Sequence, residues 1–560
     1  MLHIFMVTPE ARPFKTTGGL AEVAGALPQA LARLGHRVTL VMPRYRGIDV
    51  AGATALPADV PFGPNRYPVT FHVGSPESRL RRFAASARQA ASKNATGASK
   101  VARSEPKVTG RASAAARAAK SAAAGSVTPV FIDAPDLFDR EGVYGDAGGE
   151  YTDNAFRFAV LSRGALEYAR LTADRPSVIH THDWQTGLVP LYLRTVLADD
   201  PVLGGVPSVF TIHNVAFQGL FSPDVLRWID IAPELYNPDA LEFYGRASLL
   251  KAGTVFSNKV TTVSPTYARE LLAPDFAFAF AFEGILASRA ADFTGILNGI
   301  DTDTWDPARD RFLPEPFTVD AMNGKLEAKR ALLSVAGLPA DQAALARPTI
   351  GLLSRMTYQK GFDLLTAASD ALLELDASWV LLGDGDRQYE EFWMRLAQKH
   401  PDRVATRIGF DEQLAHLIHA GSDMFLMPSR YEPCGLNQMY AMRYGTLPVV
   451  RATGGLEDTV QDADEAPKGA TGFRFREFAS DALVDALRRG LDAYRNGRRW
   501  KTLQRNAMKQ DHSWDVSAGE YVKVYRGTAE PRGRHGIRKG TDADGRELRT
   551  DDQRGKSRTR

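Results

Sequence analysis

The chain has 560 residues, of which 44% are apolar and 24% are charged, and it contains a single cysteine. This length predicts more than one domain, and one cysteine excludes both an internal disulfide and a cysteine-based metal cluster. The formal net charge of +3 is unevenly distributed: residues 84–126 carry +7 and residues 528–560 carry +4, which leaves the rest of the chain acidic.

The N-terminal sequence MLHIFMVTPEARPF lacks the basic leader, long apolar run and small-residue cleavage site of an export signal. Nowhere do about 18 apolar residues follow one another as a membrane-spanning helix requires. We therefore expect a cytoplasmic protein with no membrane partner.

The first half of the chain alternates apolar strands with amphipathic helices. A helix is expected over 21–34, directly after the first strand and a Gly-containing loop. Short apolar runs that mostly end in polar residues predict strands at 2–8, 36–43, 127–135, 177–183, 208–214 and 259–265. This alternation is typical of a parallel sheet with helices on both faces.

The pattern restarts after residues 298–347, which are richer in Asp, Pro and Gly. A helix is expected from about 361 to 375. Strands are expected at 348–355, 379–386, 403–410, 424–430 and 446–452. The fold class is therefore α/β, with two doubly wound parallel-sheet domains. Because open α/β sheets bind ligands at the carboxyl ends of their strands, we expect the chemistry in the cleft between the domains.

Two basic segments interrupt or follow this pattern. Residues 84–126 are mostly Ala, Ser, Lys and Arg, and residues 527–560 form a tail without aromatics or periodicity. Neither composition can build a core. Neither interleaves aromatic side chains with its charges as a nucleic-acid platform would, so we expect solvated segments and no nucleic-acid partner.

Two Gly-Gly turns each precede a predicted helix, one in each half of the chain. They are Gly18-Gly19 and, after Thr453, Gly454-Gly455. Such turns can bring backbone amides close to an anion, so the pair suggests a diphosphate held from both sides, although ordinary loop chemistry is an alternative for each. Neither turn matches the phosphate-binding loop of NTPases or the dinucleotide fingerprint.

Charged residues follow two strands of the second half. Arg355 and Lys360 are suited to stabilising a leaving diphosphate, although a pair of solvated loop cations is the alternative. Glu432 could stabilise a cationic sugar or bind its hydroxyls, or it could cap the next helix. Cys434, beside it, is predicted to be a small buried filler.

Three histidines, His180, His182 and His213, stand at or near strand ends without any metal-ligand spacing. We expect His182 to hydrogen-bond a substrate hydroxyl and His180 to be structural. The Asp-x-Asp pairs at 301/303 and 384/386 lie in turns where Asp normally caps, so we expect neither a metal nor a cofactor.

A row of phenylalanines occupies alternate positions: Phe276, Phe278, Phe280 and Phe282. This alternation favours a packed or edge strand over a surface that stacks on sugar rings.

Long motifs carry a resemblance to a known family. In order they read TTGGLAEVAGALPQAL, YTDNAFRF, HTHDWQTGLVP, FTIHNVAFQGLF, VTTVSPTYARE, LNGIDTDTWDP, SRMTYQKGFDLL, PSRYEPCGLNQMYAMRYGTLPVVRATGGLEDTV and TGFRF. Over residues 2–526, apart from 84–126, the chain resembles bacterial and plastid glycogen and starch synthases.

The resemblance implies a GT-B glycosyltransferase with two Rossmann-like domains. It implies metal-independent, retaining transfer of glucose from ADP-glucose to the 4-hydroxyl at the non-reducing end of an α-1,4-glucan such as glycogen. The implied divisions are an N-terminal domain over 1–270, a nucleotide-sugar domain over 297–499, a C-terminal helix over 500–526 that crosses back to the N-terminal domain, and the tail.

The resemblance also implies roles for individual residues. Arg355 and Lys360 match the diphosphate-stabilising pair, and Glu432 matches the acid of the EPCG motif. His182 and Asp153 match residues that contact donor or acceptor. The implied substrate-binding set is Lys15, Gly18, Gly19, Asp153, Asn298, Thr453, Gly454 and Gly455.

One departure concerns the N-terminal loop. The family places a lysine two residues before Gly-Gly, but here Thr16 takes that place and Lys15 lies one residue earlier. Three alternatives stay open: a related retaining transferase that uses UDP-glucose, a catalytically silent glucan-binding protein, and a nucleic-acid-binding protein that acts through the two basic segments.

Overall fold

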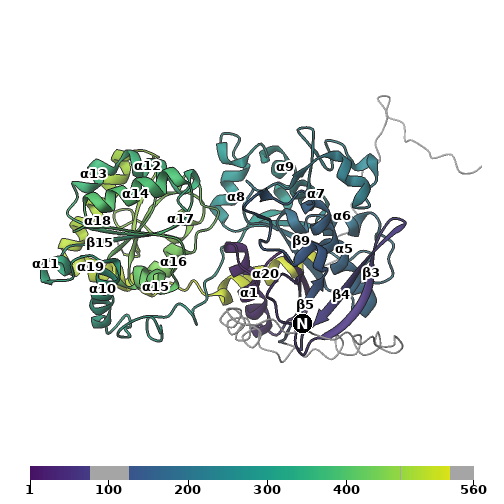
Figure 1. The fold of residues 1–560 in the computed structure, drawn as a ribbon, viewed down its shortest axis with the longest axis horizontal. Helices are drawn as coiled ribbons and strands as arrows, with labels where there is room; N and C mark the ends of the chain where they lie inside the picture. The colour runs from purple at the N-terminus through teal and green to yellow at the C-terminus, as the bar shows by residue number, and fades with distance from the viewer. Residues whose placement is uncertain (76–124, 467, 530–560) are drawn as a thin grey trace, which may run out of the picture.

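The computed structural model describes residues 1–75, 125–466 and 468–529, and two separate parallel sheets organise them (Figure 1). In spatial order, the first sheet contains β14 (Phe293–Gly295), β13 (Lys259–Thr262), β9 (Ser208–Ile212), β8 (Val178–His182), β1 (His3–Val7), β2 (Arg37–Pro43), β5 (Val127–Asp133), β4 (Asn65–Val73) and β3 (Thr54–Phe62). The strands from β14 to β5 pair in parallel, and β4 and β3 add an antiparallel hairpin at the edge.

The second sheet is parallel throughout. It contains β17 (Val404–Ile408), β16 (Ser378–Gly383), β15 (Thr349–Leu353), β18 (Met424–Met427), β19 (Leu447–Arg451) and β20 (Phe473–Phe475). From β15 the chain first builds outward to β17, and it then returns to place β18 on the other side of β15. This reversal is a topological switch point, where doubly wound sheets open a crevice.

The central strands are buried along their whole length, as β1 (HIFMV) and β16 (SWVLLG) illustrate. Such unbroken apolar runs are expected when helices cover both faces of a parallel sheet. The predicted α/β class with two parallel sheets is confirmed. The hairpin β3–β4 was not predicted, because its strands are only partly buried and mix Pro and polar residues with the apolar ones.

Helices flank both sheets. Around the first are α1 (Gly19–Arg33), α4 (Pro135–Phe138), α5 (Asn154–Thr172), α6 (Leu188–Arg194), α7 (Leu249–Phe256), α8 (Pro265–Leu272) and α9 (Glu283–Ser288). Around the second are α10 (Asn323–Ala336), α11 (Gln342–Ala346), α12 (Phe362–Ala367), α13 (Ser369–Leu373), α14 (Arg387–Lys399), α15 (Glu412–Gly421), α16 (Asn437–Arg443), α17 (Gly454–Thr459), α18 (Ser480–Arg495) and α19 (Gly497–Met508).

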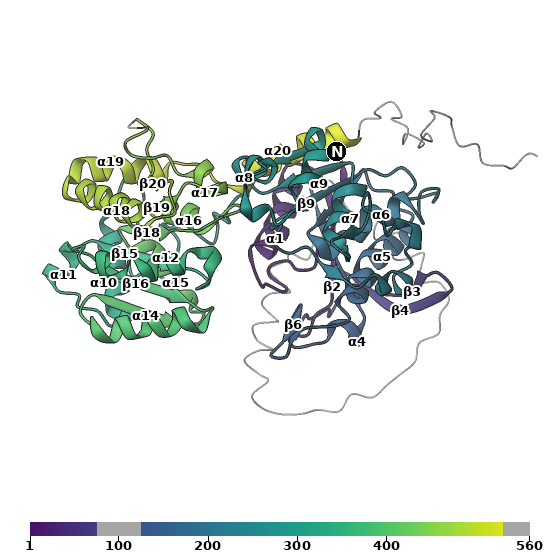
Figure 2. The ribbon, with the colours of Figure 1, turned by 90° about the horizontal axis from the view of Figure 1, so that it is seen from above.

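The C-terminal segment is two helices rather than one crossing helix. Trp500, Leu503 and Ala507 bury α19 in the core of the second sheet. Only α20 (Trp514–Ala529) crosses to the first sheet, where Figures 1 and 2 show it in yellow beside α1. The crossing at 509–513 runs beside the outward linker, since the amide of Ile300 donates to the carbonyl of His512 at 2.8 Å.

The boundaries in the structure differ from those expected from the sequence. Strand β14 pairs with β13, so the first sheet continues to Gly295, beyond residue 270. Helix α20 ends at Ala529, so the expected start of the tail at 527 falls inside it. Almost all of the basic segment 84–126 and the tail from 530 onward lie outside the described residues.

Candidate active site

A pocket of about 130 Å³ opens at the switch point, beside the carboxyl ends of β15 and β18. Its lining includes Arg355 and Lys360 from the segment after β15, and Ser429 from the segment after β18. The structure therefore gathers at one crevice the two cations that the sequence separates by five residues. Arg355 is exposed at this crevice, whereas Lys360 is half-buried.

Lys360 and Glu432 form an ion pair beside this pocket. The Lys360 Nζ atom lies 2.6 Å from Glu432 Oε2, and Ser429 Oγ donates to the same oxygen at 3.0 Å. The side chain of Lys360 is 18% exposed and that of Glu432 is 6% exposed, so this carboxylate is held almost out of water by two donors. The next residue, Gly361, has φ +77° and passes so close to Pro428 that a Cβ would lie 2.1 Å from its carbonyl oxygen.

The Gly454-Gly455 turn packs against the segment that carries Glu432. A Cβ on Gly454 would lie 1.9 Å from the carbonyl oxygen of Glu432, and one on Gly455 would lie 2.1 Å from that of Cys434. The amide of Gly455 also donates to the Glu432 carbonyl at 3.1 Å. These glycines therefore set the position of the Glu432 backbone.

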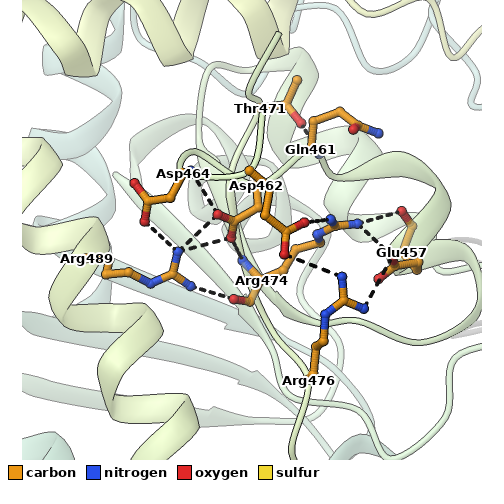
Figure 3. Close-up of polar contacts among 9 residues, drawn as sticks. Glu457, Gln461, Asp462, Asp464, Thr471, Arg474, Arg476 and Arg489 are labelled. Atoms are coloured by element: carbon orange, nitrogen blue, oxygen red, sulfur yellow. Dashed lines mark hydrogen bonds and ion pairs between the residues drawn. The ribbon is translucent and has the colours of Figure 1, made fainter. Parts of the chain in front are cut away.

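Helix α17, which begins at this turn, is tied to its own domain by ion pairs. Glu457 on α17 bonds Arg474 of β20 at 3.0 Å, and Arg476 lies near the same carboxylate (Figure 3). Asp462, just past the helix, accepts from Arg489 of α18 at 3.1 Å. The network fixes α17, and with it the Gly-Gly turn, against the second sheet.

A contact that the sequence did not reveal joins α17 to α8 of the first domain, and Figure 2 shows these helices at the boundary of the two domains. Asp458 of α17 accepts from the Thr266 amide at 3.0 Å and its hydroxyl at 2.6 Å. In return, Glu270 of α8 accepts from the Gly454 amide at 3.0 Å and from Thr453 Oγ1 at 2.9 Å. Burial raises the pKa of Glu270. Each helix thus caps the other across the domain boundary.

The N-terminal Gly18-Gly19 turn is open, with no atom within 4 Å of a Cβ on either glycine. Buried Glu10 holds this loop, because it accepts from the Thr17 amide at 2.5 Å and from the Thr17 hydroxyl at 2.8 Å. Lys15 is half-buried and Thr16 is exposed.

His182 lies fully buried at the end of β8. Its Nδ1 is 3.0 Å from Nε2 of His213, while its Nε2 has no hydrogen-bond partner within the described ranges. Burial holds the pKa of His182 well below its usual value and lowers that of His213 to about 3, so both rings are neutral. The next residue, Asp183, has φ +56° and accepts from the His213 amide at 2.7 Å.

Two predicted binding residues lie in different surroundings. Asp153 precedes α5 and pairs with both guanidinium nitrogens of Arg140, at 2.6 and 2.8 Å, and neither its hydrogen bonds nor its ion pairs reach another predicted site residue. Although burial alone would raise its pKa, Arg140 holds it below the usual value. Asn298 is buried in the linker between the sheets, and its Oδ1 has no partner.

The structural roles expected for three residues are confirmed. His180 is fully buried and bonded at both ring nitrogens, to Thr211 Oγ1 at 2.7 Å and Tyr525 Oη at 2.8 Å. Cys434 is buried in the core of the second domain. Asp301 caps a turn by accepting from the amides of Asp303 and Thr304.

The strand predicted for the phenylalanine row is wrong. Residues 277–279 form a 3-10 turn, and Phe280 and Ala281 have positive φ. Helix α9 begins at Glu283, so the segment turns rather than extends. The ring of Phe278 stacks on that of Tyr431, with centroids 4.8 Å apart, and so carries an aromatic contact from the first domain to the residue before Glu432.

Within the described ranges, no helix is long and apolar enough to cross a membrane. Over the same residues, no group of three or more His, Cys, Asp or Glu side chains is arranged to hold a metal ion.

Comparisons with known proteins identify the family. Residues 3–288 match the model of the starch synthase catalytic domain, and residues 340–507 match that of the group 1 glycosyl transferases. The chain is 45% identical over 526 residues to a glycogen synthase of Anaeromyxobacter dehalogenans, covering 94% of this chain and 99% of that protein. It is 38% identical over 533 residues to a glycogen synthase of Koribacter versatilis, covering 95% and 99%.

Solved structures agree with this relationship. The catalytic domain of starch synthase IV from Arabidopsis thaliana, bound to ADP and acarbose, superposes with a TM-score of 0.79 at 30% identity, covering 95% of this chain and all of that one. A sucrose-phosphate synthase from Thermosynechococcus elongatus, at 17% identity and a TM-score of 0.52 over 94% of this chain and 99% of that one, shares the fold. The chain is an enzyme of the glycogen and starch synthase family, a glycosyltransferase with the two-domain GT-B fold.

Proposed function

We propose that this enzyme transfers glucose from ADP-glucose to the 4-hydroxyl at the non-reducing end of an α-1,4-glucan, with retention of configuration. The observation that carries the proposal is the Lys360–Glu432 pair beside Arg355, at the switch-point pocket of a chain 45% identical to a glycogen synthase. The bond from glucose C1 to the diphosphate breaks, a bond from C1 to the acceptor oxygen forms on the same face, and the hydroxyl proton leaves with ADP.

In this proposal, Arg355 and Lys360 neutralise the charge that develops on the departing diphosphate. Glu432 would stabilise positive charge on the glucose ring. A glucose hydroxyl that reached the unpartnered Nε2 of His182 would satisfy a buried polar atom. Closure of the two domains would bring these groups together and exclude water from the donor.

We assign donor contacts to both Gly-Gly turns. Gly18 and Gly19 are supported by the open space above them, and Lys15 would supply a cation beside them. At the second turn, Thr453 and Gly454 now bond Glu270, so a donor phosphate would replace that carboxylate. Asn298 and Asp153 would contribute through hydrogen bonds to the substrates, with Asp153 exchanging its bond to Arg140.

The test is release of nucleoside diphosphate from ADP-glucose and from UDP-glucose at equal concentrations, with and without glycogen. We expect glycogen-dependent release from ADP-glucose. A preference for UDP-glucose would overturn the assignment of ADP-glucose as the donor. If neither donor released nucleoside diphosphate, the result would favour a glucan-binding protein without catalysis. Arg355→Ala and Glu432→Ala should each reduce turnover by roughly 10²-fold or more, as loss of a transition-state contact does.

The basic segments have no part in this proposal. A chain lacking residues 84–124 and 530–560 should retain its synthase activity. Loss of activity on that deletion, or salt-sensitive binding of nucleic acid that the deletion abolishes, would contradict the assignment of substrates.

A further inference from the structure

Helix α20 carries two tyrosines that contact a buried histidine of the first domain. Helix α20 follows the second domain in sequence but packs on α1 and against the strands β8 and β9. Tyr521 and Tyr525 on α20 are fully buried, and their rings lie 5.3 and 5.5 Å from that of His180. The hydroxyl of Tyr525 lies 2.8 Å from His180 Nδ1.

The protonation states of His180 and Tyr525 fix the direction of this hydrogen bond. Burial lowers the pKa of His180 to about 3, so its ring is neutral and carries one proton, and burial raises the pKa of Tyr525 well above its usual value, so the phenol keeps its proton. Among the described residues, the Tyr525 hydroxyl has no second hydrogen-bond partner. Tyr525 therefore donates to Nδ1, because the reverse arrangement would bury an unpaired hydroxyl proton.

The rest of the chain of bonds follows from this assignment. With Nδ1 accepting, the His180 proton sits on Nε2 and is donated to Thr211 Oγ1 at 2.7 Å. The Thr211 hydroxyl in turn lies 2.6 Å from Thr261 Oγ1. His180 is thus locked in one tautomer and one orientation by bonds at both ends of its ring.

His180 is in direct contact with His182. The two ring centroids are 4.1 Å apart, inside a fully buried cluster. His182 is bonded by His213 at Nδ1, and its remaining nitrogen has no partner among the residues that the structure describes. The ring of His182 therefore packs, at an interplanar angle of 46°, against a ring whose orientation is held by Tyr525 on one side and Thr211 on the other.

We propose that Tyr525 is a positioning residue for the transfer reaction: by fixing His180, it fixes the ring of His182 that faces the donor sugar. This inference rests on the proposed function of His182. It assigns the C-terminal helix a part in catalysis, because a helix that arrives from the second domain completes the support of a residue in the first.

The main test is Tyr525→Phe, which removes the hydroxyl and keeps the ring. The matched control is Tyr192→Phe, since the buried Tyr192 hydroxyl in the same domain donates to the carbonyl of Ile229 and does not contact the histidines. We expect kcat with ADP-glucose and glycogen to fall about tenfold in Tyr525→Phe, with the Kd of ADP alone unchanged. The control should lose thermal stability to a similar degree but keep its kcat.

A double-variant cycle tests the route through His180. In a His180→Gln background, adding Tyr525→Phe should lower kcat by less than about twofold, because the intermediary is already absent. Additive losses in the cycle, or equal kcat in Tyr525→Phe and Tyr192→Phe, would overturn the proposal.

A readout independent of turnover separates this proposal from the proposed function. In protein labelled with ¹⁵N-histidine, the ring resonances of His180 and His182 should both shift in Tyr525→Phe and stay in place in Tyr192→Phe. An unchanged His182 signal would overturn the positioning role. If wild-type enzyme released no nucleotide while both signals shifted, the proposed function would fail and the physical coupling would stand.

Discussion

The Lys360–Glu432 pair allows stability and catalysis to be separated. In the part of the chain that the structure describes, replacing Lys360 with Met leaves the Glu432 carboxylate, 6% exposed, with the hydroxyl of Ser429 as its remaining side-chain donor. Removing one partner of a buried ion pair typically costs about 3–5 kcal/mol, because the other charge stays buried without compensation. Since the 3.0 Å hydrogen bond from Ser429 remains, we expect Lys360→Met to lower the free energy of unfolding by about 3 kcal/mol, the lower end of this range.

The double variant Lys360→Met/Glu432→Gln removes both charges and keeps a hydrogen-bond acceptor for Ser429. We expect its stability to lie within about 1 kcal/mol of wild type, because replacing both partners avoids the stranded charge. Its activity should stay at least about 10²-fold below wild type, as low as that of the single variant.

The assay is urea unfolding followed by the fluorescence of Trp379 and Trp393, which are buried in the second domain. If the free energy of unfolding falls by about 2–3 kcal/mol per molar urea, the urea midpoint of Lys360→Met should lie about 1 M below that of wild type. The midpoint of the double variant should return to the wild-type value. Nucleotide release is measured on the same samples. An unchanged midpoint in the single variant, or recovered activity in the double variant, would refute the reasoning.

Three further outcomes follow from the geometry. Gly455→Ala should lower the melting temperature and abolish activity, because its Cβ would meet the Cys434 carbonyl at 2.1 Å. Gly18→Ala should leave the melting temperature unchanged, since the space around it is open, so any rise in KM for the donor would report a ligand contact. Because buried His180 and His213 have pKa values near 3, the unfolded chain binds more protons than the native one below pH 6.5. The free energy of unfolding should therefore fall by up to about 1.4 kcal/mol per histidine for each pH unit between 6.5 and 3. The check is the urea midpoint at pH 7 and at pH 5, and equal midpoints would contradict the prediction.

Much of the fold could be predicted from the sequence because buried parallel strands produce short apolar runs, and turn residues and amphipathic helices separate those runs here. Each predicted strand of the second half matches an observed one, from β15 to β19. The phenylalanine row failed because alternation indicates a strand only where the backbone stays extended, and here two residues with positive φ turn the chain.

The candidate site was partly predictable because its cations and its acid follow strands. The contacts that hold these side chains in place could not be predicted, because each contact joins residues far apart in sequence. Glu270 and Gly454 are separated by 184 residues, and His180 and Tyr525 by 345. Nothing in the local pattern around Glu270 or Tyr525 distinguishes them from other residues of an amphipathic helix.

The path of α20 also bears on how the protein is made. Trp514, Tyr521 and Tyr525 belong to the core of the first sheet, yet the ribosome delivers them about 230 residues after that sheet is otherwise complete. At roughly 5–20 residues per second, the first domain waits some 10–45 s for its last helix. A nascent chain halted before residue 514 should therefore expose the groove beneath α20 and be cut there by protease, whereas a chain released at residue 529 should resist.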